Sequence, residues 1–273
     1  MIPIGGSSSL LGLKITDATR AGELERLATS GQHARAIDSF RTRIRDVETV
    51  DQLMADFELY SFVMRAFDLE DQIFGKAMIE QILKSNKEEK GALITKMTDA
   101  RFREMYDTLG FGVDGVGNVN TALNSWREKM VDRYLGQLHL NDVEAQNPIV
   151  AAALTFREKA PDVDGPFDIL KDAQMTDVMR VVLGLPDQMA QLDVDRQARI
   201  LTEKYDLSRL KDPEEVERLL RRYTVIKDAL TGANVASNPV VTMMAGAVSA
   251  GRGVVDPISI DITRIPAAYR KVL

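Results

Sequence analysis

Cysteine is absent from this 273-residue chain, and aromatic residues make up only 6% of it. Without cysteine the protein has no disulfide, no thiolate zinc site and no cysteine nucleophile. Sandwiches and barrels rely on aromatic and β-branched residues, whereas the 12 methionines of this chain suit packed helices. These shortages indicate an all-α fold.

Positive charge is also in short supply, with 35 Lys and Arg against 41 Asp and Glu. No basic stripe follows any predicted helical face, so we expect no nucleic-acid partner. The longest uncharged run, residues 229–251, contains Asn234, Ser237 and Pro239 and is too polar to span a bilayer. The N-terminus lacks the basic start and apolar stretch of a signal peptide. We therefore expect a cytoplasmic protein, or one that is exported without a cleaved signal.

Apolar residues recur at helical spacing through most of the chain, as Ile37, Phe40 and Ile44 illustrate. Thr49 and Gln52 have the spacing of a capping box, in which each side chain bonds to the other residue's backbone N–H. We expect one unbroken helix behind this box, over about 51–67, and another over about 167–183.

Amino-acid composition divides the chain into three segments. Residues 1–15 are rich in glycine and serine, which predicts a flexible N-terminal segment, and residues 16–232 form the helical body. Residues 233–273 read as an extended C-terminal tail with a net charge of +2, from four basic and two acidic residues. Because the whole chain carries −6, the remainder carries −8. We predict an interaction segment that lies over the body or another subunit, the alternative being a plain disordered end; its apolar residues are Val240, Val241, Met243, Met244 and Val248.

The body contains an internal similarity. Residues 40–72 align with residues 156–188 without a gap, at an offset of 116. This predicts two duplicated helical units, over about 32–110 and 148–230, although two amphipathic helices with similar caps could also align by chance. The identical pairs include Phe40/Phe156, Arg41/Arg157, Asp46/Asp162, Asp56/Asp172, Leu69/Leu185, Asp71/Asp187 and Gln72/Gln188.

Several short stretches of these units have a familiar pattern. They are Asp56-Phe-Glu-Leu-Tyr-Ser, Arg65-Ala-Phe-Asp-Leu-Glu-Asp-Gln, Met97-Thr-Asp-Ala-Arg-Phe-Arg-Glu, Phe156-Arg-Glu-Lys-Ala-Pro and Gly184-Leu-Pro. Together they resemble an uncharacterised helical domain family of alphaproteobacteria, a domain of unknown function whose members are often encoded near flagellar genes. The resemblance covers about residues 40–223. It implies a helical fold and a flagellar setting, without catalytic residues.

Two stretches resemble ligand-binding motifs in sequence but lack other features that those motifs require. Gly110-Phe-Gly-Val-Asp-Gly115 fits a dinucleotide fingerprint, but a helical segment precedes it where that motif needs a strand. A helix-ending glycine followed by a connector is the better interpretation. Asp162-Val-Asp-Gly165 resembles the start of a calcium loop, but the later ligand positions hold Pro166 and Phe167. We predict no cofactor and no metal.

Other candidate residues have structural explanations. His33 and His139, the only histidines, lie far apart in sequence and are expected at the surface or its boundary. Trp126, Met130 and Tyr134 form a helical stripe that we assign to core packing or to an interface. Acidic residues gather at the turns, where they would stabilise helix starts; they are Glu70, Asp71, Asp187, Asp193 and Asp195.

The sequence therefore favours a non-enzymatic protein-interaction or assembly protein, with flagellar components or a second copy of itself as partners. An enzyme or small-molecule binder with a site assembled from dispersed residues is the first alternative. A chaperone-like binder of exported subunits is the second. A deep polar pocket would favour the enzyme, and an exposed apolar groove would favour either binding protein.

Overall fold

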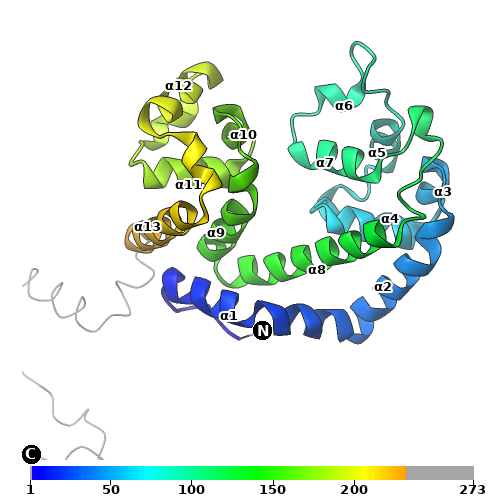
Figure 1. The fold of residues 1–273 in the computed structure, drawn as a ribbon, viewed down its shortest axis with the longest axis horizontal. Coiled ribbons are helices and arrows are strands. Elements are labelled where there is room, and N and C mark those ends of the chain that lie inside the picture. Colours follow the sequence, from blue (N-terminus) through cyan, green and yellow to red (C-terminus); the bar gives the residue numbers. More distant parts are fainter. Residues whose placement is uncertain (1, 232–273) are drawn as a thin grey trace, which may run out of the picture.

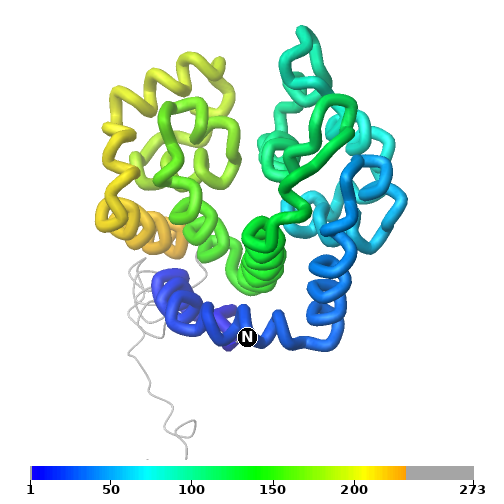
Figure 2. The backbone as a smooth tube through the Cα atoms, turned by 45° about the vertical axis from the view of Figure 1, so that its right-hand side comes forward, coloured from blue at the N-terminus to red at the C-terminus, as the bar shows by residue number. Residues whose placement is uncertain are grey.

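The computed structural model describes residues 2–231, which form two helical lobes above a base of long helices (Figures 1 and 2). The described part contains thirteen α-helices and six short 3-10 turns, and its only β-type pairing is an isolated bridge between Thr49 and Val116. The all-α prediction is confirmed. The predicted tail segment, from Val240 to Val248, lies outside the described residues.

The elements follow one another along the chain in two groups. The base and first lobe comprise α1 (Ser9–Thr29), α2 (Gly31–Arg43), α3 (Val50–Ala55), α4 (Phe57–Ala66), α5 (Lys76–Leu83), α6 (Leu93–Lys96), α7 (Ala100–Leu109) and α8 (Asn124–Gln146). The second lobe comprises α9 (Pro148–Lys159), α10 (Pro166–Leu170), α11 (Ala173–Val182), α12 (Val194–Lys204) and α13 (Pro213–Thr231).

Each lobe has its own apolar core, and α1 and α8 contribute to both. In α1, Leu27 belongs to the first core and Leu13 to the second. In α8, Tyr134 belongs to the first core and Val143 to the second. The two long helices therefore tie the lobes together by burial at both of their ends.

The N-terminal segment is more ordered than we predicted. Helix α1 begins at Ser9, capped by the Ser8 side chain, and both Ile4 and Leu13 are buried. Gly12 faces α9 so closely that a Cβ there would lie 3.1 Å from a methyl group of Val150. The prediction of a flexible segment over residues 1–15 was wrong because tertiary packing, which composition does not reveal, holds this glycine- and serine-rich stretch.

The elements recur at the predicted offset of 116. The short turn Ile44–Asp46 is matched by Ala160–Asp162, and helix α4 is matched residue for residue by α11. The capping box of Thr49 and Gln52 is present at the start of α3. The regularity supports the interpretation of two duplicated units.

Each predicted long helix is instead divided in two. Asp56 ends α3 and caps α4, accepting hydrogen bonds from the backbone N–H groups of Glu58 and Leu59. Asp172 caps α11 in the same way, and α10 before it ends at Leu170 with Lys171 as its C-cap. We had noted that the two aspartates match, but we had not predicted that they divide the helices. They do so because an Asp side chain competes with the helical backbone carbonyls for the N–H groups of the residues that follow it.

Candidate functional site

A charged cleft of about 420 Å³ separates the two lobes. Its cations already have partners nearby: Lys159 lies 2.6 Å from Asp172, Arg133 lies 2.6 Å from Glu104, and Arg101 lies 2.8 Å from Asp99. Its lining has seven acidic and four basic side chains, so negative charge is in moderate excess. With its cations paired, the cleft offers little to attract an anionic ligand.

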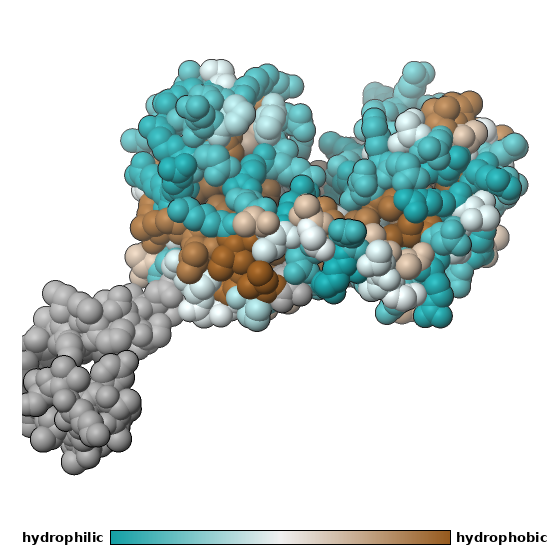
Figure 3. Space-filling model, turned by 60° about the horizontal axis from the view of Figure 1, so that its bottom comes forward, coloured by the Kyte–Doolittle hydropathy of each residue, from teal (hydrophilic) through white to brown (hydrophobic). Residues whose placement is uncertain are grey.

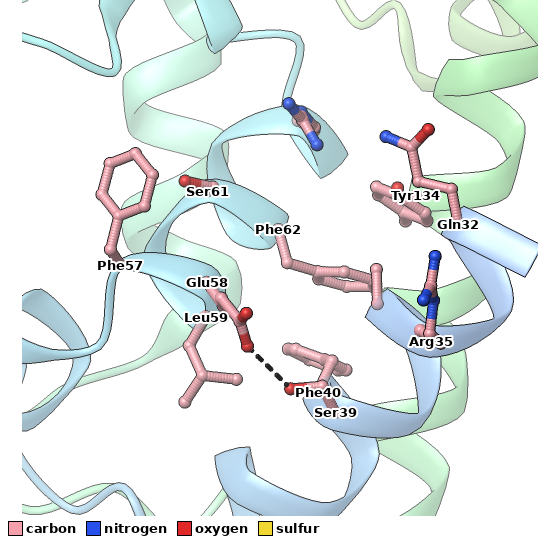
Figure 4. Close-up of a pocket in the computed structure, with 12 residues that line it drawn as sticks. Gln32, Arg35, Ser39, Phe40, Phe57, Glu58, Leu59, Ser61, Phe62 and Tyr134 are labelled. Atoms are coloured by element: carbon pink, nitrogen blue, oxygen red, sulfur yellow. Dashed lines mark hydrogen bonds between the residues drawn. The ribbon is translucent and has the colours of Figure 1, made fainter.

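A larger groove of about 530 Å³ lies in the first lobe, between α2 and α4 (Figure 4). Its floor consists of three stacked rings. The ring centroid of Phe62 lies 4.2 Å from that of Phe40 on one side and 4.2 Å from that of Tyr134 on the other. Such stacking fixes the rings in place, and because all three residues are at most 3% exposed they form a packed base beneath the groove.

Helical spacing brings the walls of the groove together. One face of α2 contributes Gln32, Arg35, Ala36 and Ser39, which follow the i, i+3, i+4, i+7 pattern. One face of α4 contributes Glu58, Ser61, Phe62 and Arg65 with the same spacing. At the outer edge of α4 stands Phe57, whose side chain is 61% exposed although it is large and apolar.

The charges around the groove differ in whether they have partners. Glu58 accepts a hydrogen bond of 2.6 Å from Arg43, and Arg65 donates one of 2.9 Å to Glu70. Among the described residues Arg35 forms no ion pair, and its Nε donates only to the carbonyl of Gly31, at 2.8 Å. The groove therefore combines an apolar floor with one guanidinium group available for a carboxylate.

Two hydroxyl groups lie along the same floor. Ser61 Oγ is buried and has no hydrogen-bond partner among the described residues. The Tyr134 hydroxyl lies 2.9 Å from Nδ1 of His33, and burial raises the pKa of Tyr134. Burial likewise lowers the pKa of His33. The neutral imidazole and the neutral phenol thus form an uncharged polar contact at the base of the groove at neutral pH.

The predicted stripe on α8 packs inside the chain. Met130 and Tyr134 are each 1% exposed and belong to the first core. Trp126 is partly buried against the same core, and its indole N–H donates to the carbonyl of Thr108 at 2.9 Å. These contacts favour the core-packing interpretation for Met130 and Tyr134, while Tyr134 also reaches the base of the groove.

Burial also corrects the expectation for His139. This residue is 3% exposed, and neither of its ring nitrogens has a hydrogen-bond partner among the described residues. We had expected a surface or boundary position. The sequence carries no signal of the difference, because α1 covers this face of α8 only in the folded protein.

The remaining motif residues cap helices or stabilise turns. Gly110 ends α7 with φ of +65°, as expected for a helix-ending glycine. The carboxylate of Asp168 accepts hydrogen bonds from the N–H groups of Asp164 and Gly165, so the suspected calcium loop is a turn that starts α10. Asp193 caps α12, and Asp187 pairs with Arg180.

A second apolar surface lies on the second lobe, where the start of α1 meets the end of α13 (Figure 3). The exposed large apolar residues of these two helices include Leu11, Val225 and Leu230, at 50%, 54% and 73%. We had predicted from the sequence neither this surface nor the groove formed by residues such as Arg35, Phe57 and Ser61. Helical spacing could have placed these residues on common faces, but not shown that the faces stay uncovered.

Two further properties concern only residues 2–231. None of their helices combines the length and the apolar character required to cross a membrane. They also contain no cluster of three or more His, Asp or Glu side chains placed to hold a metal ion.

A family model described as "Protein of unknown function (DUF1217)" matches residues 66–216, which is more than half of the chain. The chain belongs to the DUF1217 family. The matched region runs from the end of α4 to the start of α13 and so crosses both lobes. The resemblance to a helical domain of unknown function is therefore confirmed.

A solved structure shares the fold of this DUF1217 protein. The crystal structure of protein AGR_C_984 from Agrobacterium tumefaciens, an alphaproteobacterium, is similar with a TM-score of 0.71 and 29% sequence identity. The similarity covers 83% of this chain and 95% of the other. No curated protein matches the sequence.

Proposed function

We propose that this DUF1217 protein is a non-enzymatic interaction or assembly protein whose α2–α4 groove binds a segment of a protein partner. The observation that carries the proposal is a groove above a packed aromatic base, with an exposed Phe57 at its edge. On its wall stands Arg35, which forms no ion pair within the described part of the chain. Grooves between two helices suit an amphipathic helix that inserts its apolar side chains.

The partner's chemistry follows from the groove. The rings of Phe40 and Phe62 are only 1% and 3% exposed, so an apolar or aromatic anchor would pack mainly against the exposed ring of Phe57. A carboxylate close to that anchor would pair with Arg35. A guanidinium group binds a carboxylate through two parallel hydrogen bonds, which adds orientation to the apolar contact. The family resemblance makes a flagellar component the expected partner, met in the cytoplasm or after export.

The test compares two double variants of equal chemistry. Phe57→Ser with Arg35→Glu alters the groove, whereas Phe74→Ser with Arg199→Glu alters an exposed Phe outside the groove and an exposed Arg on α12. All four side chains are exposed, so both variants should fold like the parent. We expect affinity capture from the native cell to recover a common partner with the parent and the control. Binding of that purified partner to the groove variant should be weaker by about ten-fold or more.

The control variant separates an effect of the groove from a general effect of changing one exposed Phe and one exposed Arg. Equal recovery by all three proteins would contradict the proposal, as would equal loss by both double variants. Circular dichroism of each variant verifies that the helical content is unchanged.

A further inference from the structure

The cleft between the two lobes (Figure 2) contains acidic side chains that its own cations leave unpaired. Each of its four basic side chains already has a carboxylate partner; the pairs are Arg101 with Asp68 and Asp99, Arg133 with Glu104, Lys159 with Asp172, and Lys171 with Asp168. Three carboxylates of the lining remain, on Glu144, Glu158 and Asp162. They are exposed, and their side chains form no ion pair or hydrogen bond within the part of the chain that the structure describes. A cleft with unpaired charges of one sign attracts ions of the other sign.

One buried hydroxyl group in the same lining also lacks a partner. Thr155 of α9 is 7% exposed, and its Oγ1 forms no hydrogen bond among the described residues. Other buried helical threonines, such as Thr16 and Thr224, donate to the carbonyl four residues earlier. A buried hydroxyl without a partner lowers stability, so this oxygen marks a position where a ligand would gain a hydrogen bond.

The unpaired carboxylates suit a long cation and not a single metal ion. They come from α8, from α9 and from the turn that follows α9, and the described residues contain no group of three acidic or histidine side chains placed to hold a metal. Two large apolar side chains, Phe67 and Leu140, also line the cleft. Its volume of about 420 Å³ is within the usual range for small-molecule sites. A linear polyamine has the matching chemistry, since methylene segments separate its ammonium groups.

We propose that the cleft between the lobes binds a small linear polyamine. The ammonium groups pair with Glu144, Glu158 and Asp162. One of them donates an N–H to Oγ1 of Thr155, and a methylene segment packs on Leu140. The cleft shares no lining residue with the α2–α4 groove, so this inference and the function proposed above can fail independently.

Isothermal titration calorimetry of the full-length chain with spermidine, at low ionic strength, tests the proposal. Two triple variants are compared, and each removes three negative charges, which takes the net charge from −6 to −3. The cleft variant carries Glu144→Gln, Glu158→Gln and Asp162→Asn, and the control carries Glu25→Gln, Asp195→Asn and Glu203→Gln, at exposed positions outside the cleft. We expect the cleft variant to bind spermidine about ten-fold more weakly than the parent, and the control to differ by less than about two-fold. Equal weakening in both variants would show a response to net charge alone and would overturn the proposal, as would the absence of binding to the parent.

A fourth protein, Thr155→Val, separates a ligand contact from a structural role of the hydroxyl. The change keeps the shape of the side chain and removes a polar group that has no partner, so the ligand-free variant should resist urea at least as well as the parent. Its affinity for spermidine should nevertheless fall by about three-fold or more, because the ligand loses a hydrogen bond. An unchanged affinity for spermidine would rule the proposed binding mode out, whatever the stability of the variant.

Discussion

At the scale of single residues, His139 is the most unusual group in the described part of the chain. It faces α1 from the middle of α8, almost fully buried and without a hydrogen-bond partner for either ring nitrogen. Burial is the main cause of its lowered pKa, and Arg20 acts in the same direction, against the nearby Glu23 and Asp142. A charged imidazolium would be costly in this position, so the folded protein keeps the ring neutral.

This burial predicts a dependence of stability on pH. Because the pKa of His139 lies below its ordinary 6.5 when the protein is folded, the unfolded chain binds more protons just below that pH. The contribution of His139 to the free energy of unfolding should therefore be highest above about pH 6.5. It should fall as the pH is lowered from there towards the folded-state pKa, and stay constant below that pKa. Chemical denaturation of the parent and of His139→Leu at several pH values checks this.

The variant should show a flatter pH profile than the parent. His33→Gln serves as the comparison, because it removes the other histidine and leaves the contribution of His139 in place. A His139→Leu profile as steep as that of the parent would show that other groups determine the acid sensitivity.

At the scale of elements, aspartate caps decide where the helices are divided. Asp56 and Asp172 occupy equivalent positions at the offset of 116, and each caps the helix that follows it. Each also pairs with a cation of the helix two elements earlier: Asp56 with Arg43, and Asp172 with Lys159. The same residue type thus repeats both a cap and a helix-to-helix contact in the two lobes.

We predict that Asp56→Ala and Asp172→Ala each lower the free energy of unfolding by about 1 kcal/mol, the usual cost of losing an N-cap. Asp172→Asn should recover most of this loss, because an amide oxygen still accepts from the backbone while the pairing with Lys159 disappears. Asp38→Ala, an exposed position within α2, is the matched control and should change stability little. Urea denaturation measures all four, and equal effects at Asp38 and Asp172 would refute the capping account.

At the scale of the whole molecule, α8 connects the two cores through a segment that contains a glycine. Gly136 lies between Tyr134, in the first core, and Val143, in the second. Glycine is unfavourable within a helix because the unfolded chain gains freedom at that position. A Cβ added at Gly136 would meet no atom within 4 Å.

Gly136→Ala should therefore raise the free energy of unfolding by about 0.5–1 kcal/mol. Since α8 belongs to both cores, the gain should appear equally in Trp126 fluorescence, which reports on the first lobe, and in the total helical signal from circular dichroism. Gly110→Ala should act in the opposite direction, because φ there is +65° and the new Cβ would lie 2.5 Å from the side-chain nitrogen of Asn120. A shift seen by only one probe would show that the lobes unfold separately.

What the sequence determined by itself is local. The helical stripes, the capping box at Thr49 and the helix-ending Gly110 depend on residues within a few positions of one another, and all three are present. The tertiary structure alone decided the order of the first fifteen residues, the burial of His139 and the openness of the groove beside Phe57. Each of these depends on which helix from a distant part of the chain covers a given face, and the spacing of residues along one helix carries no information about that.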